Sequence, residues 1–392
     1  MLPLHGITVV TVEQAVAAPF ASRQLADLGA RVIKVERPGS GDFARDYDAV
    51  VNGLSAHFVW LNRSKESVTL DLKQPEAADA LRRLVARADV FIHNLAPGAM
   101  ARLGFDSAAL RQAYPTLVIC EISGYGSTGP YRDKKAYDLL VQSEAGLVSL
   151  TGTPEAPARV GLSVADISAG MYALSGILAA LLRRERSGEG ATLDISLFDS
   201  LAEWMGFPAL YTDYGGTPPA RTGARHPTIA PYGPFVAGDG KTVYLAIQSP
   251  REWPRFCEEV IERPELIEAP RFATNPSRVE HRFALEAIIT ASFSRFKAEE
   301  IVNRLDAAGI ANARMNSVSE ILSHPQLQTR DRWRQVDSPA GPLRALLPPF
   351  NLEGEDVPMG PVPALGAHSD AVLGEIGFDA ATVAEWRHRG IV

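Results

Sequence analysis

Strand-like and helical patterns alternate along the first 125 residues of the chain. Short runs rich in Val and Ile are separated by stretches whose apolar positions recur three and four residues apart. The predicted strands are Ile7–Val12, Arg31–Glu36, Val68–Leu72, Asp89–His93 and Thr116–Ser123, and the predicted helices between them are Phe20–Leu28, Pro75–Arg87 and Ser107–Ala113. This alternation is typical of a parallel, doubly wound sheet, so we predict an α/β fold.

The pattern changes character near Gly215, where Gly and Pro become frequent and indicate a linker. Before it we predict helices over Asp138–Leu147, Asp166–Arg184 and Leu197–Tyr211, with a strand at Ala191–Ser196. After it we predict a hairpin of Tyr232–Val236 and Thr242–Ile247, and helices at Glu252–Ile261, Val279–Phe293 and Ala298–Ala308. From Trp333 the chain is rich in proline and is predicted to be loop-like, with closing helices at Ser369–Ile376 and Ala380–Arg389.

Composition narrows the class of protein. The chain has 392 residues, which is enough for two domains with large cores. Its net charge of -7 argues against general nucleic-acid binding, so an anionic ligand would have to be met by local basic residues. Two cysteines, Cys120 and Cys257, indicate a reducing compartment rather than a disulfide framework.

The first residues lead directly into a strand-like run, without the pattern of a secretory signal. The longest apolar stretch, Ile167–Leu182, is shorter than the roughly 20 residues that a bilayer span needs. We interpret it as a buried core helix and expect a cytoplasmic protein without a membrane partner.

Asp166 is a lone acid in the segment 160–170, among small and apolar neighbours and directly before that apolar stretch. An ionised carboxylate is costly to bury without partners, so its presence needs a reason. Asp is a favoured helix N-cap, and the helix dipole stabilises its charge. A carboxylate crowded only by small side chains could also act as a nucleophile. The segment leaves both interpretations open.

Several common chemistries lack their sequence signatures. The stretch between Val12 and Leu28 contains no glycine, which argues against a dinucleotide-binding turn. No nucleophile-elbow motif, metalloprotease motif or phosphate-binding loop occurs. The histidines at 57, 93, 226 and 281 are scattered, so we predict no metal site.

Basic residues recur after the predicted strands of the N-terminal part. Arg37 follows the second strand, Lys73 the third and Arg102 the fourth. In open α/β sheets, ligands bind outside the carboxyl ends of the strands. Any one of these cations could be an ordinary loop residue, but together they favour a polyphosphate ligand.

Six ordered blocks over the first 235 residues resemble a known family. They are Leu28–Asp42, Asn62–Lys73, Asn94–Gly104, Ile122–Pro130, the Asp166 segment 160–170 and Arg186–Gly190. These blocks are similar to the class III CoA transferases, the formyl-CoA and carnitine-CoA transferase type, which also includes the α-methylacyl-CoA racemases.

The resemblance implies a fold and a site. It implies a large Rossmann-like domain with a parallel sheet, made of 1–214 and the returning tail 331–392, a smaller α+β domain at 215–330, and an interlocked homodimer. Coenzyme A would be a cosubstrate, with no permanently bound cofactor. Asp166 matches the catalytic aspartate, and the positions that match the CoA site are Val16, Ala17, Arg37, Leu70, Lys73, Asn94, Leu95, Arg102, Lys135 and Tyr137.

The family's two chemistries use this aspartate differently. Racemases pair it with a histidine in a Gly-His-Asp segment, whereas this chain has Ala136-Tyr137-Asp138. A tyrosine with an ordinary pKa near 10 is a poor base at neutral pH, so the sequence favours CoA transfer. Transfer would proceed through a mixed anhydride and a CoA thioester on an ionised Asp166. Racemisation and non-catalytic CoA binding are the alternative hypotheses.

Two segments bear on the acyl group. Arg221–Pro234 resembles branches that act on C4–C6 dicarboxylates of the succinate, itaconate, mesaconate, citramalate and glutarate type, with succinyl-CoA as the expected donor. Arg225 and His226 could clamp a distal carboxylate or belong to a basic linker, and both interpretations stay open. The strand at Val243–Pro250 lacks the glycine run of formyl-CoA transferases, which makes oxalate a less favoured acceptor.

Overall fold

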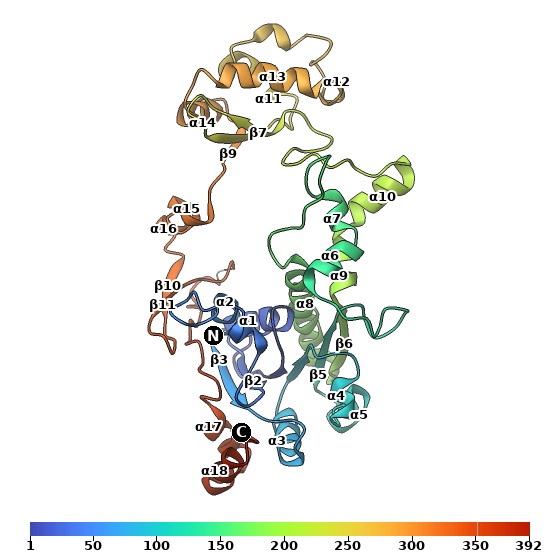
Figure 1. Cartoon of the computed structure of the whole chain (residues 1–392), viewed down its shortest axis with the longest axis vertical. Coiled ribbons are helices and arrows are strands. Elements are labelled where there is room, and N and C mark those ends of the chain that lie inside the picture. The colour runs from blue at the N-terminus through green and yellow to red at the C-terminus, as the bar shows by residue number, and fades with distance from the viewer. Residues whose placement is uncertain (351) are drawn as a thin grey trace. The chain divides into compact units, whose positions relative to one another are not determined.

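The computed structural model describes residues 1–350 and 352–392 (Figure 1). The chain forms two compact units, each made of segments that are distant in sequence. Unit 1 comprises Met1–Leu147, Val160–Phe207 and Arg330–Val392, and unit 2 comprises Val148–Arg159 and Pro208–Thr329. Both chain termini therefore belong to unit 1.

Unit 1 is built on a six-stranded parallel sheet in the order β3-β2-β1-β4-β5-β6. Its strands are β1 Thr8–Val12, β2 Arg31–Glu36, β3 Lys65–Thr69, β4 Val90–His93, β5 Val118–Ser123 and β6 Ala191–Ser196. The strand order reverses direction between β1 and β4, and ligands of such sheets bind at this switch point. The α/β prediction is confirmed.

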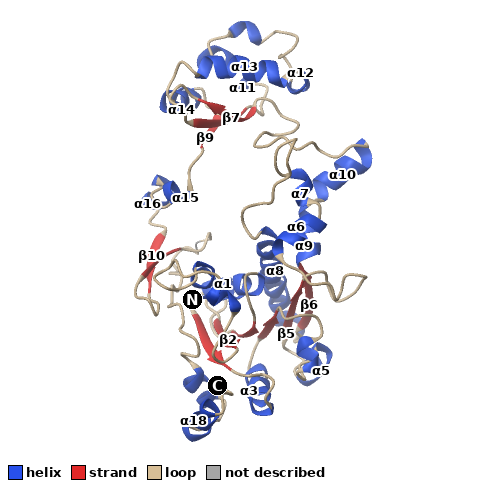
Figure 2. Ribbon diagram, viewed as in Figure 1, coloured by secondary structure: helices blue, strands red, loops and turns tan. Residues whose placement is uncertain are grey.

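Two apolar cores lie on opposite faces of this sheet (Figure 2). They form because buried strands present apolar side chains to both faces. The helices of one core are α1 Ala17–Asp27, α6 Asp138–Glu144, α8 Val164–Ser187 and α9 Leu197–Trp204, and those of the other are α3 Pro75–Val85, α4 Ala99–Arg102, α5 Ser107–Ala113, α17 Ser369–Glu375 and α18 Ala380–His388. Two shorter elements, η1 Phe43–Asp46 and α2 Ala56–Asn62, lie between β2 and β3.

Helix α8 packs closely against α1. Gly170 allows this approach, because a Cβ there would lie 2.7 Å from the carbonyl oxygen of Ala17. By length and composition, α8 is also the described helix that could cross a membrane, but half of its most apolar window is buried. Core helices of soluble proteins meet the same criteria.

The C-terminal segment covers the outer edge of β3. The backbone N–H of Ser67 donates to His368 Nδ1 and that of Thr69 donates to Ser369 Oγ. The backbone N–H of His368 in turn donates to the carbonyl of Ser67. An open edge strand invites pairing with another chain, and these bonds occupy it.

Two predictions in unit 1 are wrong in position. Strand β3 begins at Lys65 rather than Val68, because its first residues, although charged or polar, pair with β2. The stretch after Trp333 is not only loop, since Trp333–Val336 (β10) and Leu343–Leu346 (β11) form an antiparallel hairpin. Its alternating polar and apolar residues and the Ser338–Pro342 turn account for that hairpin.

Unit 2 contains a three-stranded antiparallel sheet, β7-β8-β9, with its own apolar core. The strands are β7 Tyr232–Val236, β8 Thr242–Ala246 and β9 Ala311–Arg314, and the predicted hairpin is confirmed. Its helices are α11 Glu252–Arg255, a π-helical turn at Phe256–Val260, a 3-10 turn at Pro264–Leu266, α12 Asn275–Glu280, α13 Arg282–Phe293, α14 Ala298–Ala307, α15 Val318–Ile321 and α16 Pro325–Thr329. Two of the four unit boundaries fall within α7 Leu147–Leu150 and α10 Gly206–Gly215.

Candidate active site

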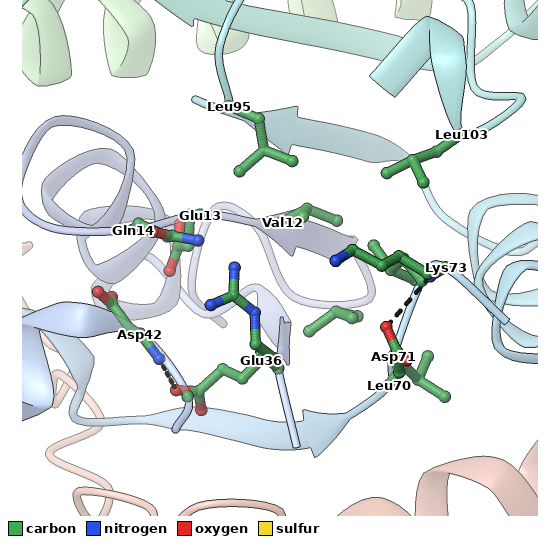
Figure 3. Close-up of a pocket in the computed structure, with 14 residues that line it drawn as sticks. Val12, Glu13, Gln14, Glu36, Asp42, Leu70, Asp71, Lys73, Leu95 and Leu103 are labelled. Carbon is green, nitrogen blue, oxygen red and sulfur yellow. Dashed lines mark hydrogen bonds between the residues drawn. The ribbon is translucent and has the colours of Figure 1, made fainter. Parts of the chain in front are cut away.

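A pocket opens at the carboxyl ends of β1 to β4, beside the switch point of the sheet (Figure 3). Its empty space, counted with its open mouth, is about 670 Å³. Small-molecule sites commonly have volumes of about 300–1,000 Å³. The lining residues are Val12, Glu13, Gln14, Val35, Glu36, Arg37, Gly41, Asp42, Leu70, Asp71, Leu72, Lys73, Leu95 and Leu103.

The pocket combines apolar walls with cations at its rim. Leu95 and Leu103 project into it from the β4 side, and the side chain of Lys73 extends toward Val12 (Figure 3). Arg37 and Lys73 are exposed, so their charges are available to a ligand. Four acids also line the pocket, and three of them are paired with buried or partly buried cations. The exposed Arg37 and Lys73 therefore suit a ligand that carries an apolar group and several negative charges.

The structure brings together four of the ten residues that the resemblance placed at the CoA site. These four, Arg37, Leu70, Lys73 and Leu95, line the pocket. The other six are not among its lining residues: Val16 and Ala17 are buried at the start of α1, Asn94 lies next to Leu95, Arg102 is exposed on α4, and Lys135 and Tyr137 are exposed before α6.

Asn94 links the ends of two central strands. Its amide Nδ2 donates to the carbonyl of Gln14, and its Oδ1 accepts from the backbone N–H of the same residue, both at 2.8 Å. The side chain is therefore engaged with protein backbone. It fixes the loop after β1, which lines the pocket, against the end of β4.

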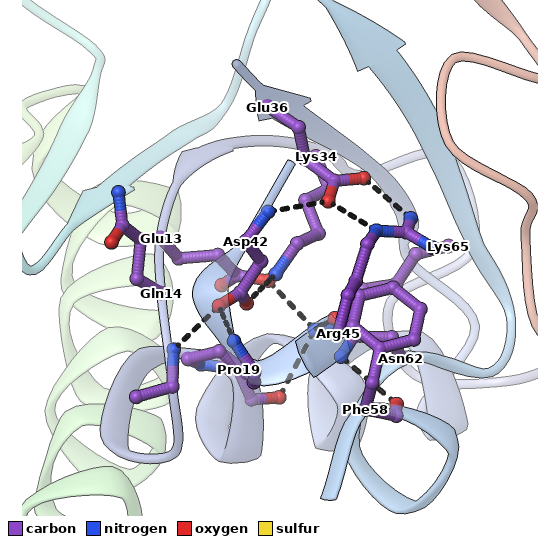
Figure 4. Close-up of polar contacts among 12 residues, drawn as sticks. Glu13, Gln14, Pro19, Lys34, Glu36, Asp42, Arg45, Phe58, Asn62 and Lys65 are labelled. Atoms are coloured by element: carbon purple, nitrogen blue, oxygen red, sulfur yellow. Dashed lines mark hydrogen bonds and ion pairs between the residues drawn. The ribbon is translucent and has the colours of Figure 1, made fainter. Parts of the chain in front are cut away.

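Glu13 and Asp42 of the pocket lining belong to a group of four buried charged residues, Glu13, Lys34, Asp42 and Lys65, here called the buried ion cluster (Figure 4). Lys34 Nζ lies 2.7 Å from Asp42 Oδ2 and 3.5 Å from Glu13 Oε1, and Lys65 Nζ lies 2.7 Å from Glu13 Oε1. Buried charges persist in proteins when they are paired and hydrogen-bonded, and each of these four is paired.

The ammonium group of Lys65 has one acceptor for each proton, since the carbonyl of Pro19 and Oδ1 of Asn62 join Glu13. Burial lowers the pKa of Lys65. The three acceptors around its Nζ nevertheless match the three protons of a charged ammonium group. Burial alone would raise the pKa of Glu13, but Lys65 and Lys34 outweigh it and lower that pKa.

The buried ion cluster also fixes the backbone beside the pocket. Oδ1 of Asp42 accepts from the backbone N–H of Ala15 at 3.0 Å and from that of Ala44 at 2.9 Å. Ala15 has a φ of 61°, which is uncommon for a residue with a Cβ. Asp42 therefore holds a strained turn that leads into α1.

Asp166 lies in the first turn of α8, but it is not the N-cap of that helix. The cap position is Ser163, so the interpretation of Asp166 as a cap is wrong. Asp166 is half-buried, and none of the described residues donates a hydrogen bond to its carboxylate. Burial, followed by the charge of Asp138, raises its pKa to about 7. The charge of this carboxylate is thus not compensated in unit 1.

The start of α8 is capped by a residue from another helix. Asp138, the first residue of α6, accepts at Oδ1 from the backbone N–H of Ala165 at 2.8 Å and of Asp166 at 3.3 Å. These are donors that a helix leaves without an intrahelical partner. Gln142, one turn along α6 and fully buried, donates to Asp138 Oδ2 and accepts from the backbone N–H of Val160.

Tyr47, at the end of η1, belongs to the surroundings of Asp166. Burial first, and then the charges of Asp42 and Asp166, raise its pKa to about 12. The ring is half exposed and packs edge-on against His57 at 5.5 Å. Tyr47 is therefore a neutral hydrogen-bonding group near Asp166 over the whole physiological pH range.

Arg225 and His226 lie in unit 2. The Arg225 guanidinium Nε contacts both carboxylate oxygens of Glu286, at 2.9 and 3.0 Å. The His226 ring stacks on Tyr232 with centroids 5.1 Å apart. Arg225 would have to leave Glu286, or share it, to bind a substrate carboxylate.

Sequence reasoning missed Asp138, Gln142, Tyr47 and the buried ion cluster as contributors to the site. A lysine inside a strand normally indicates an exposed face, so the signal of Lys34 and Lys65 was misleading. Asp138 was visible only as the last residue of the segment that was compared with racemases. Its contact with α8 spans 27 residues of sequence and depends on tertiary structure.

Comparisons with known proteins agree with this architecture. The sequence pattern of CoA-transferase family III matches residues 4–369. Succinate–glutarate CoA-transferase of Agrobacterium fabrum is 34% identical, over 95% of this chain and 96% of its own. Acetyl-CoA:oxalate CoA-transferase of Acetobacter aceti is 36% identical, over 84% of this chain and 85% of its own.

A solved structure is similar over almost the whole chain. It is a CAIB/BAIF family protein from Brucella suis, with a TM-score of 0.84 and 33% sequence identity. The similarity covers 96% of this chain and 99% of that chain. Sequence and fold thus agree over both units, and the protein belongs to CoA-transferase family III.

Proposed function

We propose that this protein transfers coenzyme A from an acyl-CoA, of the succinyl-CoA type, to a second short dicarboxylic acid. Unit 1 is the CoA-binding domain, with Arg37 and Lys73 facing the phosphates at the pocket rim. Asp166 is the nucleophile that carries the acyl group. Coenzyme A takes part as a cosubstrate, and the chemistry needs no permanently bound cofactor.

In the first half of the reaction, the ionised Asp166 carboxylate attacks the thioester carbonyl. A mixed anhydride forms, the C–S bond breaks and CoA thiolate leaves with the electron pair. The thiolate then attacks the carbonyl carbon of Asp166, and the C–O bond of the anhydride breaks. This gives an aspartyl-CoA thioester and frees the donor acid as its carboxylate.

In the second half, the acceptor carboxylate attacks the aspartyl thioester and releases the thiolate again. The thiolate attacks the acceptor carbonyl of the new anhydride, which forms the product acyl-CoA and regenerates Asp166. Water must be kept from both anhydrides, because hydrolysis would end the cycle.

The observation that carries this proposal is the uncompensated charge of Asp166. A half-buried carboxylate without a hydrogen-bond donor, and with its pKa raised to about 7, is less stabilised than an ordinary surface aspartate. Acylation removes its negative charge and so relieves this destabilisation. Perturbed carboxylates of this kind cluster at functional sites.

Racemisation would require a second acid/base group across the substrate from Asp166. The phenol nearest to this role is Tyr47, whose pKa of about 12 makes it a poor base at neutral pH. Position 137, where the resembling racemases have histidine, is also a tyrosine. The tyrosines at positions 47 and 137 therefore both favour CoA transfer over racemisation.

The acyl groups are proposed from the relatives, which include enzymes named for glutarate and for oxalate. Both names specify dicarboxylates. Of the two we propose the glutarate type, because the strand at Val243–Pro250 lacks the glycine run of the formyl-CoA transferases. We propose that Arg225, exchanging Glu286 for a substrate, and His226 bind the distal carboxylate in an interlocked homodimer. A cytoplasmic location suits this use of acyl-CoA.

The test is exchange of isotope between two acids. Purified protein with unlabelled succinyl-CoA and ¹⁴C-labelled succinate or glutarate should form labelled acyl-CoA. Asp166→Asn should lower this rate by about 10⁴-fold or more while CoA still binds. Asp379→Asn, at the N-cap of α18, is the matched control and should transfer normally.

Substantial exchange by Asp166→Asn would disprove the nucleophile. Wild-type protein that binds CoA without any exchange across a screen of C2–C6 acids would instead indicate a non-catalytic CoA-binding protein. Loss of α-deuterium from a branched acyl-CoA without an acceptor acid would indicate a racemase.

A further inference from the structure

Three features of the Asp166 region have no role in the reaction as written above. The start of α8 is capped from α6 rather than by its own cap residue. The capping group is a carboxylate, Asp138, next to a second carboxylate that must react. A fully buried amide, Gln142, holds that capping carboxylate in place.

We propose that Asp138 is a positioning residue that fixes the first turn of α8 and, through its charge, makes Asp166 a more reactive nucleophile. This inference rests on the proposed function, since it concerns the same reaction. It assigns a role to Asp138 alone and leaves the carrier role with Asp166.

The hydrogen bonds that Asp138 accepts fix the backbone of Asp166. Asp138 Oδ1 accepts from two successive backbone N–H groups, those of Ala165 and Asp166. An ordinary N-cap side chain would satisfy the same donors, but the side chain of Ser163 makes no such bond. The backbone of Asp166 is therefore held by α6, and the direction of its side chain follows from that anchor.

Gln142 completes the anchor. Its Nε2 donates to Asp138 Oδ2 at 2.6 Å, and its Oε1 accepts from the backbone N–H of Val160 at 3.0 Å. One amide thus orients the capping carboxylate and ties down the segment that leads into α8. Asp138 accepts three hydrogen bonds in all, as an ionised carboxylate can.

The position of Asp138 also lets its charge act on Asp166. A helix N-terminus normally stabilises a carboxylate in its first turn. Here the Asp138 carboxylate occupies that positive end, so Asp166 loses part of this stabilisation and meets a like charge instead. Both effects disfavour the anion of Asp166 relative to its protonated and acylated forms, which carry no charge.

Other groups near Asp166 do not supply this effect. The phenol of Tyr47 is neutral at physiological pH, and α1 meets α8 beside the site through Ala17 and Phe20. Charged side chains on the other elements packed against α8 are engaged elsewhere: Arg23 with Asp27, Asp199 with Ser196, Asp194 with Ser127 and Glu121 with His93.

The experiment separates the two roles of Asp138 by the pH dependence of kcat/KM. Asp138→Asn keeps the Oδ1 acceptor and removes the charge, so the acid limb should move down by about one pH unit. Its plateau should fall about three- to tenfold, because a less basic carboxylate is a weaker nucleophile. Asp138→Ala also removes the capping oxygen, so its Tm should lie about 1–3 °C below that of Asp138→Asn.

In Asp138→Asn the new amide N–H groups would face the donating Nε2 of Gln142, which is an unfavourable contact. A second, double variant removes this contact. In Asp138→Asn/Gln142→Glu, the new carboxylate accepts from the Asn amide and restores a negative charge near the start of α8. Its acid limb should return part of the way toward that of the wild type. Asp379→Asn again serves as the matched control and should leave the profile unchanged.

Two results would overturn the inference. One is a folded Asp138→Asn protein whose acid limb stays within about 0.3 pH unit of the wild type. The other is a folded Asp138→Asn protein without measurable transfer that Gln142→Glu does not rescue. Either result, with Asp166→Asn inactive, leaves the proposed function standing. Full activity of Asp166→Asn would instead remove the proposed function itself.

Discussion

Unit 1 contains two kinds of buried carboxylate, and the contrast between them separates structure from chemistry. In the buried ion cluster, Glu13 and Asp42 each contact a lysine at 2.7 Å. Next to it, Glu36 accepts from Arg45 and Ser67; burial alone would raise its pKa, but these contacts bring it to about 2. Asp166 has no such partner among the described residues, and its pKa is raised to about 7.

The difference lies in the surroundings rather than in the residue type. Paired carboxylates stay ionised and hold backbone, as Asp42 does for Ala15. An unpaired carboxylate that faces another acid is poised to lose its charge, by protonation or by acylation. A residue of the first kind stabilises the backbone around the pocket. Asp166, a residue of the second kind, is not among the residues that line the pocket, and its carboxylate is available to react.

The largest expected effect on stability comes from breaking the buried ion cluster. Lys65→Ala leaves the buried Glu13 with the hydroxyl of Ser22 and, as its remaining cationic partner, Lys34 at 3.5 Å. Removal of one partner of a buried pair typically costs about 3–5 kcal/mol. Urea unfolding should show this loss. Arg31→Ala, which breaks partly exposed pairs with Glu66 and Glu375, should cost under about 2 kcal/mol.

Equal losses in the free energy of unfolding for the two variants would show that the buried pair contributes no more to stability than the partly exposed pairs do. A double variant, Glu13→Gln/Lys65→Met, removes both charges and should recover part of the loss. No recovery would mean that the individual hydrogen bonds, rather than the pairing of charge, determine the stability of this region.

The opposite sign is expected for Asp166→Asn. The folded pKa of Asp166 lies near 7, above the value of 3.8 for an unfolded chain. Below pH 3.8 both states are protonated, and between the two values the unfolded state loses its proton first, so the wild-type protein is progressively destabilised as the pH rises. Above pH 7 this penalty is complete, at up to about 4 kcal/mol.

Asp166→Asn should therefore raise Tm at pH 8.5 and change it little at pH 4. Differential scanning fluorimetry across pH measures this directly. A variant that loses stability at pH 8.5 would show that Asp166 is a paired structural carboxylate like Glu36.

A smaller effect concerns the pH dependence of the wild-type reaction. Because the nucleophile must be ionised, kcat/KM should fall about tenfold per pH unit below an apparent pKa near 7. Initial rates between pH 5 and 9 test this. A limb near pH 4 would mean that the free enzyme stabilises the Asp166 anion as an ordinary surface site does.

The smallest effect is expected at the pocket rim. Lys73 is exposed, so Lys73→Ala should raise KM for the acyl-CoA about five- to tenfold and leave kcat nearly unchanged. The effect should weaken as ionic strength rises, because the charge is screened. An unchanged KM at low salt would place the phosphates elsewhere.

Much of the fold could be predicted because its central strands and helices carry regular patterns. Arg31–Glu36, Ser107–Ala113 and Ala191–Ser196 begin and end as predicted. The prediction of β3 was displaced because its first residues, Lys65 and Glu66, have the composition of a surface segment. Their pairing with β2, and the ion pair of Lys65 with Glu13, depend on residues far away in the sequence.

The candidate site shows the same division. Asp166 was recognisable from its segment, because a lone acid before an apolar helix is locally unusual. Its partner Asp138 was not, since the contact exists only once α6 and α8 are packed together. Arg102, Lys135 and Tyr137 matched the family's positions but are not among the residues that line the pocket.

The most direct test of the central claim is to trap the acyl carrier. The protein should be mixed with succinyl-CoA and quenched with hydroxylamine or borohydride, digested, and examined by peptide mass. The account predicts a hydroxamate or an alcohol at Asp166, in the peptide that contains the start of α8, and none in Asp166→Asn. An unmodified Asp166 under conditions of rapid isotope exchange, or the adduct at another carboxylate, would contradict it.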